Sequence, residues 1–230
     1  TRYLVSFGKE LGLETLQDAV GNVLIRKPAT PGMEDRKTVT LQSHLDMVPQ
    51  KNSTVQHDFT TDPIDAYIEG EWVTARETTL GADDGMGVAL AMAVLAAKEL
   101  RHGPIEALFT VDEEEAMDGA FGLRPHWLKG DVLLNCDSEK EGELYVGCAG
   151  GVNVNVSLQY KDDLVIPEGD VAVKVTLTGL KGGHSGVDIH LGRANANKLM
   201  FRFLKEAVRD YGARLAEVEG GNMHNAIPRE

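Results

Sequence analysis

In the first 140 residues, three short apolar runs each lead directly into histidine or carboxylate side chains. The runs, with the polar residues that follow them, are 38–43 with His44 and Asp46, 105–111 with Asp112 to Glu115, and 132–134 with Asp137. Runs of this length predict strands, and an apolar pattern from Gly81 to about Arg101 predicts a helix between the first two of them. Strands joined by a crossover helix predict an α/β fold with a mostly parallel, helix-covered sheet.

The polar residues after these strands are expected to meet at one edge of the sheet. Ligands of open α/β sheets bind outside the carboxyl ends of the strands, and all three polar clusters fall there. A fourth cluster, Asp83-Asp84, stands at the start of the predicted helix. The sequence therefore predicts that acidic side chains from distant segments gather at one place.

The pattern changes at the glycine-rich stretch 147–151. Residues 152–158 and 171–177 alternate strictly between apolar and polar side chains, as half-buried antiparallel strands do. A helix is predicted from about 194 to 210, followed by a strand from 214 to 219. We therefore place a domain boundary at the glycines, with one domain at residues 1–150 and an α+β domain at residues 151–230.

Composition narrows the classes of partner. The chain has 36 Asp and Glu against 23 Lys and Arg, which argues against nucleic-acid binding because phosphate contacts need concentrated basic side chains. The two cysteines, Cys136 and Cys148, lack the spacing of a thiolate zinc site. We find no charged-then-apolar leader and no apolar run near 18 residues, so we expect a cytoplasmic protein without a membrane partner.

Two of the clusters also have an interpretation without catalysis. His44 and Asp46 point to the same side of a strand end, either as a metal ligand with its carboxylate partner or as a hydrogen-bonded surface pair. Asp83 and Asp84 fit helix-capping acids or a metal bridge. The glycines around them lack the full G-x-G-x-x-G pattern of a nucleotide loop, so we discount nucleotide binding.

The other two clusters follow predicted apolar strands, of which the first, before Glu113, is expected to be buried. The run Glu113-Glu114-Glu115 would ordinarily be a solvated charge run, and Asp137 would ordinarily be a turn residue. At the exit of a strand, however, one carboxylate can bind a metal ion while its neighbour acts as general base on the attacking water. The order of all four clusters favours this second interpretation.

The residues around the clusters resemble one known family. The matching stretches are HLDMVPQK, TLGADDGMG, FTVDEEE, AMDGAFGL, NCDSEKEGELYVGCAGG, LKGGHSG and HNAIPRE. Together they closely resemble the aminoacyl-histidine dipeptidases, relatives of aminoacylases and tripeptidases, through essentially all 230 residues. The resemblance implies a zinc-peptidase catalytic domain followed by the start of a lid domain, and a small unblocked dipeptide, of the Xaa-His type, as substrate.

The resemblance also implies roles for individual residues around two zinc ions, for which Co²⁺ or Mn²⁺ could substitute. The implied roles are terminal ligands of different ions for His44 and Asp137, a bridge for Asp83, a further ligand for Glu114, the general base for Glu113 and the partner of the His44 ring for Asp46.

In the second domain, His184 lies in a glycine-rich turn next to Ser185. A nucleophilic serine is rejected because Val187 stands where the pattern G-x-S-x-G requires a glycine. The resemblance implies instead that His184 reaches the oxyanion of the reaction from the lid, and that Asn225 contacts the substrate.

Several alternatives stay open at this point. The related activities are those of an aminotripeptidase or an N-acyl amino acid deacylase, and a metal-binding module without catalysis is the rival from another class. A homodimer is left open. Two positions depart from the family pattern: Glu77 replaces a glycine, and Glu115-Ala116 replaces a small residue and a glycine, which permits a shift by one place between base and ligand.

Both ends of the sequence look cut. The chain begins at Thr1 within a predicted helix and ends at Glu230 without the further histidine ligand that the family pattern requires. We therefore expect these 230 residues by themselves to hold at most one metal ion firmly and to hydrolyse dipeptides poorly.

Overall fold

The computed structural model describes the chain except for residues 53, 139, 149, 151, 153 and 162–166. It contains two compact units, Thr1–Gly150 and Gly151–Glu230. The elements of the first unit are α1 (Arg2–Glu10), β1 (Glu14–Gln17), β2 (Val23–Lys27), β3 (Val39–His44), β4 (Ala66–Glu69), β5 (Trp72–Ala75), α2 (Ala82–Ala96), β6 (Ile105–Thr110), α3 (Asp118–Phe121) and β7 (Val132–Asn135).

The main sheet of the first unit has the strand order β1-β2-β6-β3-β7. Strand β3 pairs in parallel with β6 and β7, as expected when helix α2 carries the chain from β3 back to the start of β6. Strands β1 and β2 pair antiparallel with each other, and β2 pairs antiparallel with β6. The α/β class is thus confirmed, but the sheet is mixed rather than mostly parallel, because β2 runs antiparallel to both of its neighbours, β1 and β6.

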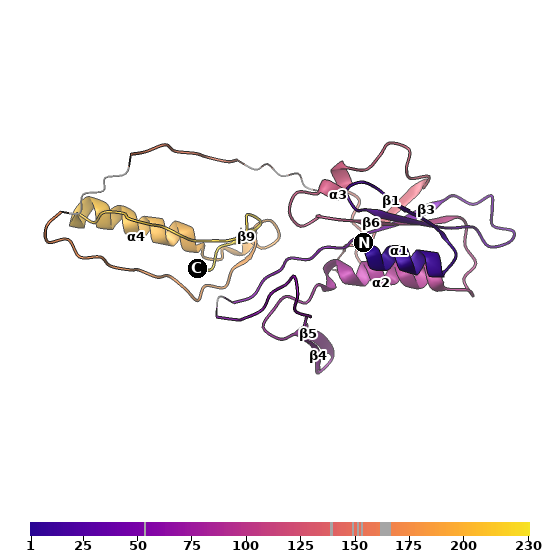
Figure 1. Ribbon diagram of the computed structural model, residues 1–230, viewed down its shortest axis with the longest axis horizontal. Coiled ribbons are helices and arrows are strands. Elements are labelled where there is room, and N and C mark those ends of the chain that lie inside the picture. Colours follow the sequence, from indigo (N-terminus) through magenta and orange to yellow (C-terminus); the bar gives the residue numbers. More distant parts are fainter. Residues whose placement is uncertain (53, 139, 149, 151, 153, 162–166) are drawn as a thin grey trace. The chain divides into compact units, whose positions relative to one another are not determined.

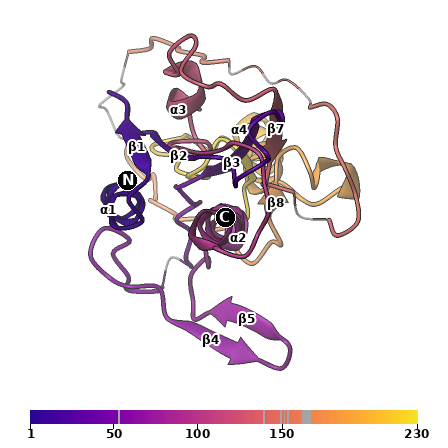
Figure 2. The ribbon, with the colours of Figure 1, turned by 90° about the vertical axis from the view of Figure 1, so that its right-hand side faces the viewer.

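Helices α1 and α2 cover one face of this sheet, and the short α3 lies on the other (Figures 1 and 2). The core lies beneath α1 and α2, where Ile25, Leu41 and Phe109 pack with Leu4 and Leu95. Every residue of β6 is buried, as its central position requires. Each large apolar side chain so buried contributes about 1.5–3 kcal/mol of transfer free energy, which anchors the strands that end at the site.

Helix α2 is fixed at its far end by a lysine from the sheet. The Lys27 ammonium donates to the carbonyl oxygens of Val94 and Ala97, at 2.9 and 2.5 Å. A cation at a helix C-terminus satisfies carbonyl groups that have no partner within the helix. This contact sets the position of α2 along the sheet, and thereby the position of its first turn at the opposite end.

The second unit contains β8 (Gly183–His184), a short 3-10 helix η1 (Ile189–Leu191), α4 (Ala196–Tyr211) and β9 (Ala226–Ile227). Helix α4 was predicted, and it begins where the Asn195 side chain accepts a hydrogen bond from the backbone N–H of Lys198. Strands β8 and β9 pair antiparallel. None of the described helices, in either unit, is long and apolar enough to cross a membrane.

The three strands predicted in the second unit were wrong. The described residues of 152–158, 171–177 and 214–219 form no strand. An alternating segment is stable as a strand only where its ladder is paired and its apolar face is covered. Here the apolar side chains of these segments face solvent, as Val156 at 87% and Val171 at 81% exposure show.

Candidate metal centre

His44 stands at the end of β3, between the ends of β6 and β7, and is 1% exposed. Its Nε2 lies 3.0 Å from Oδ1 of Asp83 and 3.8 Å from Oδ1 of Asp137. Its Nδ1 lies 3.0 Å from the backbone oxygen of Asp46 and 3.5 Å from the Asp46 carboxylate. Asp46 thus holds the Nδ1 edge of the ring, and Nε2 faces the carboxylates of Asp83 and Asp137.

The two aspartates at the start of α2, Asp83 and Asp84, make different contacts. Asp84 is buried, and its carboxylate accepts from the backbone N–H of His44 and from that of Gly87, each at 3.1 Å. It caps the regular part of α2 and ties it to β3, so the helix-cap interpretation applies to Asp84. Asp83 has non-helical dihedral angles (φ −87°, ψ 112°) and turns its carboxylate toward His44.

The glutamates after β6 are held by Asp46. Its two carboxylate oxygens accept from the backbone N–H groups of Glu113 and Glu114, each at 3.1 Å. The predicted contact between Asp46 and the His44 ring runs chiefly through the Asp46 backbone oxygen, and the carboxylate orients the acidic loop. Glu113 and Glu114 are half-buried, whereas Glu115 is exposed.

Two sets of side chains could each hold a metal ion. In one, ligand atoms of His44, Asp83 and Asp137 lie within 4.8 Å of one another; in the other, His44 joins Glu113 and Glu114 within the same distance. Imidazole and carboxylate donors of this kind suit Zn²⁺, Co²⁺ and Mn²⁺. His44 belongs to both sets, so the distribution of ligands between two ions stays a prediction.

Electrostatics show that the cluster carries an excess of negative charge. Burial and the neighbouring carboxylates of Asp83 and Asp84 raise the pKa of Asp137 to about 7. Burial, with Asp83, Glu113 and Asp46 nearby, raises the pKa of Glu114. Burial opposes protonation of His44, but the surrounding carboxylates outweigh it and raise the pKa of the ring. A divalent cation would relieve the repulsion that causes these shifts.

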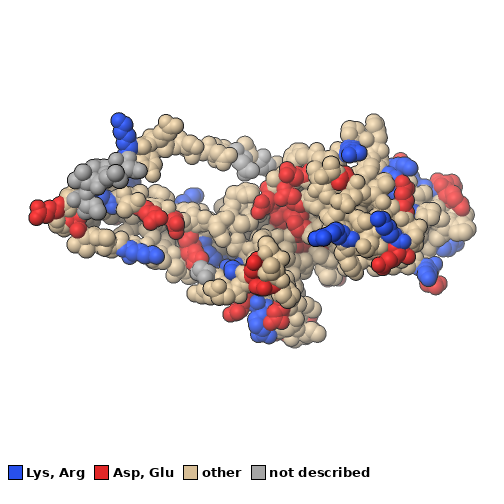
Figure 3. Space-filling view, in the orientation of Figure 1, with Lys and Arg blue, Asp and Glu red and all other residues tan. Residues whose placement is uncertain are grey.

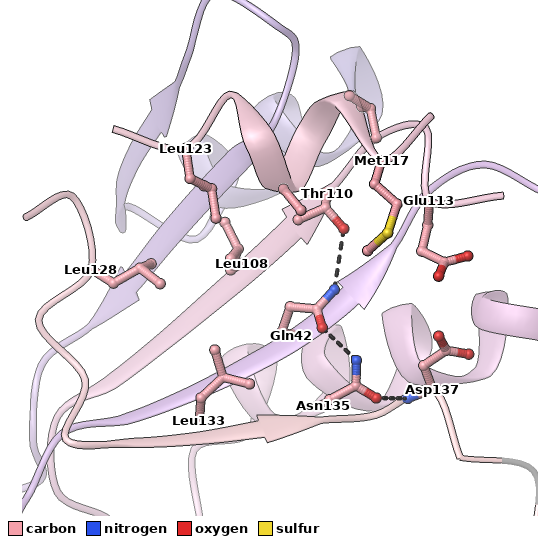
Figure 4. Close-up of a pocket in the computed structure, with 12 residues that line it drawn as sticks. Gln42, Leu108, Thr110, Glu113, Met117, Leu123, Leu128, Leu133, Asn135 and Asp137 are labelled. Carbon is pink, nitrogen blue, oxygen red and sulfur yellow. Dashed lines mark hydrogen bonds between the residues drawn. The ribbon is translucent and has the colours of Figure 1, made fainter. Parts of the chain in front are cut away.

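Acidic side chains gather at the edge of the first unit where β3, β6 and β7 end, as the space-filling view shows (Figure 3). A cavity of about 240 Å³ lies beside them, with an apolar wall that includes Leu108, Leu123 and Leu133. Glu113 and Asp137 stand at its other end (Figure 4). The sequence pattern did not predict this cavity, because the residues of its wall come from three separate segments.

A relay of hydrogen bonds along the cavity floor holds Asp137 (Figure 4). Gln42 donates to the Thr110 hydroxyl at 3.1 Å, and its amide oxygen accepts from Asn135 at 2.6 Å. The Asn135 side chain then accepts from the backbone N–H of Asp137 at 3.1 Å. Side chains from three parallel strands thereby hold the backbone of Asp137.

Of the two candidate residues of the second unit, His184 lies in β8 and Asn225 directly precedes β9. His184 in β8 is opposite Ala226 in β9, and the backbone oxygen of Asn225 accepts from Ser185 at 2.8 Å. The His184 Nδ1 accepts from the backbone N–H groups of Gly186 and Val187, at 3.0 and 3.1 Å. The neutral ring therefore carries its proton on Nε2, so that His184 offers a hydrogen-bond donor.

A comparison with known families decides the assignment. Residues 40–224 match the model of peptidase family M20/M25/M40, and this span contains His184 and all the candidate residues of the first unit, while Asn225 directly follows it. The chain belongs to peptidase family M20/M25/M40. The sequence motifs had indicated this group, and the predicted resemblance to dipeptidases within it is confirmed by the relatives described next.

The M20 chain is 57% identical to the cytosol non-specific dipeptidase of Escherichia coli (strain K12), over 99% of this chain and 47% of that protein. The structure of aminoacylhistidine dipeptidase from Vibrio alginolyticus matches with a TM-score of 0.64 and 54% identity, over 99% of this chain and 46% of the other. A tripeptidase from Staphylococcus aureus, at 15% identity and a TM-score of 0.50, shares the fold alone. The chain spans about half the length of the dipeptidases it matches.

Sequence reasoning missed two contacts that shape the M20 site. The grip of Asp46 on the acidic loop joins residues 67 and 68 positions apart, which leaves no local signal. Asn22 contacts the same loop from the start of β2. Asp18 stands three residues before the pair Gly21-Asn22, which directly precedes β2. This spacing is a turn signal that could have drawn attention to Asn22.

Glu77 adopts a backbone conformation that favours glycine. Its φ is +64°, in the left-handed region. This explains why a glycine is expected at this position in the family, and identifies the cost of the replacement as local backbone strain.

Proposed function

We propose that this M20 chain supplies the metal-binding part of an enzyme that hydrolyses small unblocked dipeptides, Xaa-His dipeptides among them. The observation that carries the proposal is the junction of two candidate ligand sets at His44, beside a pair of glutamates that Asp46 holds by its carboxylate. The names of the Escherichia coli and Vibrio alginolyticus relatives support a dipeptide as the substrate.

The ligands would be His44, Asp83, Glu114 and Asp137, which hold two zinc ions in the proposal. Divalent ions bound there would polarise the scissile carbonyl and activate a water molecule. Asp83 would be shared between the ions, since its carboxylate faces both His44 and Asp137. Asp46 would hold the backbone of Glu113 and Glu114 in place by accepting hydrogen bonds from their N–H groups.

Glu113 would move the proton. Its carboxylate would accept a proton from the attacking water and return it to the amine that leaves. In the second unit, which we propose to be the lid, Nε2–H of His184 would donate to the developing oxyanion, because Nδ1 is already occupied by two backbone N–H groups. Asn225, which directly precedes β9, would contact the substrate.

The cytoplasm is the proposed site of action. The support is the word cytosol in the name of the Escherichia coli relative, which is 57% identical. Small unblocked peptides are a substrate class that such a protein would meet there.

The test uses a chimaera in which these 230 residues replace the matching segment of the Escherichia coli dipeptidase. We expect it to bind zinc and to cleave carnosine and other unblocked dipeptides faster than tripeptides or N-acyl amino acids. The Glu113→Gln chimaera should keep its zinc and lose turnover. Preference for N-acyl amino acids or tripeptides would replace the substrate proposal, and zinc binding without hydrolysis of any of them would favour a non-catalytic metal-binding module.

A further inference from the structure

Asn22 joins the two ends of the loop that carries the site glutamates. Its side chain is fully buried at the start of β2. Its Oδ1 accepts from the backbone N–H of Val111, at 3.1 Å, and its Nδ2 donates to the backbone oxygen of Gly119, at 2.8 Å. Val111 and Gly119 stand immediately before and after residues 112–118, so one side chain grips both ends of this loop.

Asp18 fixes the orientation of the Asn22 amide. One carboxylate oxygen of Asp18 accepts from the backbone N–H groups of Val20, Gly21 and Asn22, at 3.1, 2.9 and 2.9 Å. The other accepts from Nδ2 of Asn22, at 2.7 Å. The amide nitrogen thus faces two acceptors and the amide oxygen faces one donor, which leaves only one orientation of the Asn22 side chain.

The loop itself needs such a grip. Asp112 and Met117 both have positive φ, at 59° and 57°, a region that costs free energy for residues other than glycine. Asp112 accepts from the N–H groups of Ala116 and Asp118, each at 3.3 Å, which closes the loop on itself but ties it to no strand. Gly119 must lack a side chain, since a Cβ there would collide with the Val111 backbone oxygen and with Asn22.

Among the described hydrogen bonds, those from two side chains outside the loop, Asp46 and Asn22, reach its backbone. Asp46 holds its middle through Glu113 and Glu114, and Asn22 holds its ends. Asp46 also contacts the His44 ring, so its replacement would disturb the metal ligands directly. Asn22 has none of its described hydrogen bonds to a candidate ligand, and its replacement would act on the site only through the loop.

We propose that Asn22, oriented by Asp18, is a positioning residue that sets the positions of Glu113 and Glu114 at the metal centre by fixing both ends of the loop. This inference rests on the proposed function for the identity of the site. It assigns to the turn before β2 a task that the site chemistry requires, although this turn contributes no ligand.

The test compares Asn22→Ala with Thr40→Val in the chimaera that tests the proposed function. Thr40 is also buried and polar, and its hydroxyl donates to Glu106 at 3.1 Å on the same sheet, without contact to the loop. The milder variant Asp18→Asn serves if Asn22→Ala fails to fold. Three quantities are measured: zinc affinity by calorimetry, the absorption spectrum of bound Co²⁺, and amide hydrogen exchange with and without metal.

We expect Asn22→Ala to weaken zinc binding by about 10-fold or more, which is the usual cost of losing a group that orients a metal ligand. The Co²⁺ spectrum should change, and the amides of Val111, Glu113 and Gly119 should exchange faster even without metal. Asp18→Asn should shift all three quantities in the same direction, by less. Thr40→Val should lower the thermal midpoint and leave zinc affinity, spectrum and loop exchange unchanged.

Zinc affinity, Co²⁺ spectrum and loop exchange at wild-type values in Asn22→Ala would overturn the proposal and reduce Asn22 to a structural residue. A chimaera with the unaltered segment that binds no zinc would instead overturn the proposed function. In that case the amide exchange still decides whether Asn22 fixes the loop: faster exchange in the variant supports it, and unchanged exchange refutes it.

Discussion

Replacement of Glu106 by alanine should destabilise the first unit strongly, although Glu106 lies outside the metal centre. This carboxylate is 1% exposed and accepts four hydrogen bonds. The donors are Arg26 Nε at 2.8 Å, the Thr40 hydroxyl at 3.1 Å, and the backbone N–H groups of Lys129 and Gly130 at 2.9 and 3.0 Å. It therefore ties the segment before β7 to β2, β3 and β6.

The magnitude follows from what the alanine would leave behind. Breaking a buried ion pair by removing one partner costs about 3–5 kcal/mol, because the remaining charge stays buried without its partner. Arg26 would keep Glu14 and the backbone oxygen of Trp127, which moderates the loss on its side. The hydroxyl and the two backbone N–H groups would lose their acceptor at about 1 kcal/mol or more each. The three donors together lose about 3 kcal/mol, and with the moderated loss at Arg26 we expect a total of about 3–5 kcal/mol for Glu106→Ala.

Glu14→Ala is the matched control. Glu14 pairs with the same guanidinium, at 3.0 Å, but its side chain is 54% exposed. Exposed ion pairs contribute about 0–1 kcal/mol, so this variant should stay within 1 kcal/mol of the wild type. Urea unfolding followed by tryptophan fluorescence measures both variants, because Trp72 and Trp127 are the two tryptophans of the chain and both lie in the first unit.

The pH dependence of unfolding gives an independent check. Burial would raise the pKa of Glu106, but Arg26 and the other donors outweigh it, so that its folded-state pKa is lowered. The stabilisation is therefore present above the ordinary glutamate pKa of about 4.3 and is lost as the pH falls through the folded value. Glu106→Gln should lack this part of the acid dependence. A Glu106→Ala chain within about 1 kcal/mol of wild type, at an unchanged denaturant slope, would refute the reasoning.

Glu114→Ala should lower zinc content in the chimaera while Glu113→Gln keeps it, because only Glu114 is proposed as a ligand; the reverse result in a metal assay would show a shift by one place. Asp83→Ala should weaken both zinc sites and Asp137→Ala mainly one, as stoichiometry by calorimetry would show, and two intact sites in Asp83→Ala would exclude a bridge. In chelator, the raised pKa of Asp137 means that the folded state binds the extra proton, so stability should fall as the pH rises from about 4 to 7, and Asp137→Asn should remove this decline and be more stable at pH 7 by over about 1 kcal/mol. Glu77→Gly should raise stability by about 0.5 kcal/mol in urea unfolding, since relief of a positive φ, about 1–2 kcal/mol, exceeds the added entropy of the unfolded chain; a loss would contradict this.

The strands that position the site could be predicted from the sequence alone. Runs 38–43, 105–111 and 132–134 correspond to β3, β6 and β7 to within one residue at each end. These runs are short, apolar and bounded by polar residues, which gives them a strong local signal even for β7, an exposed strand at the edge of the sheet. Because the site residues follow directly after them, the location of the candidate metal centre was predictable as well.

The second unit shows where a local pattern fails. Residues 171–177 alternate as an ideal half-buried strand does, yet they form no strand. Alternation describes what a side chain would bury, whereas pairing depends on a neighbouring strand that the segment itself does not encode. Helix α4 was predictable because its hydrogen bonds close within the segment and Asn195 marks its start.

The contacts that join the site are of the same non-local kind. Asn22 and Val111 are 89 positions apart, and His44 and Asp84 are 40 apart. In each case a side chain binds a backbone group of another segment, and no periodicity reports such a bond. The sequence can therefore indicate which side chains carry the chemistry, since these stand at strand ends. The sequence does not indicate which residues of other segments hold these side chains in position.

Two buried or half-buried carboxylates near the candidate metal centre accept hydrogen bonds from backbone N–H groups rather than from other side chains. Asp84 binds the N–H groups of His44 and Gly87, and Asp46 binds those of Glu113 and Glu114. A carboxylate cluster that repels itself would spread apart if it were held only by its own side chains. Backbone N–H groups attract carboxylates without adding a titrating cation, so they fix the acids in place and leave the charge of Asp83, Glu114 and Asp137 to be balanced by a metal ion.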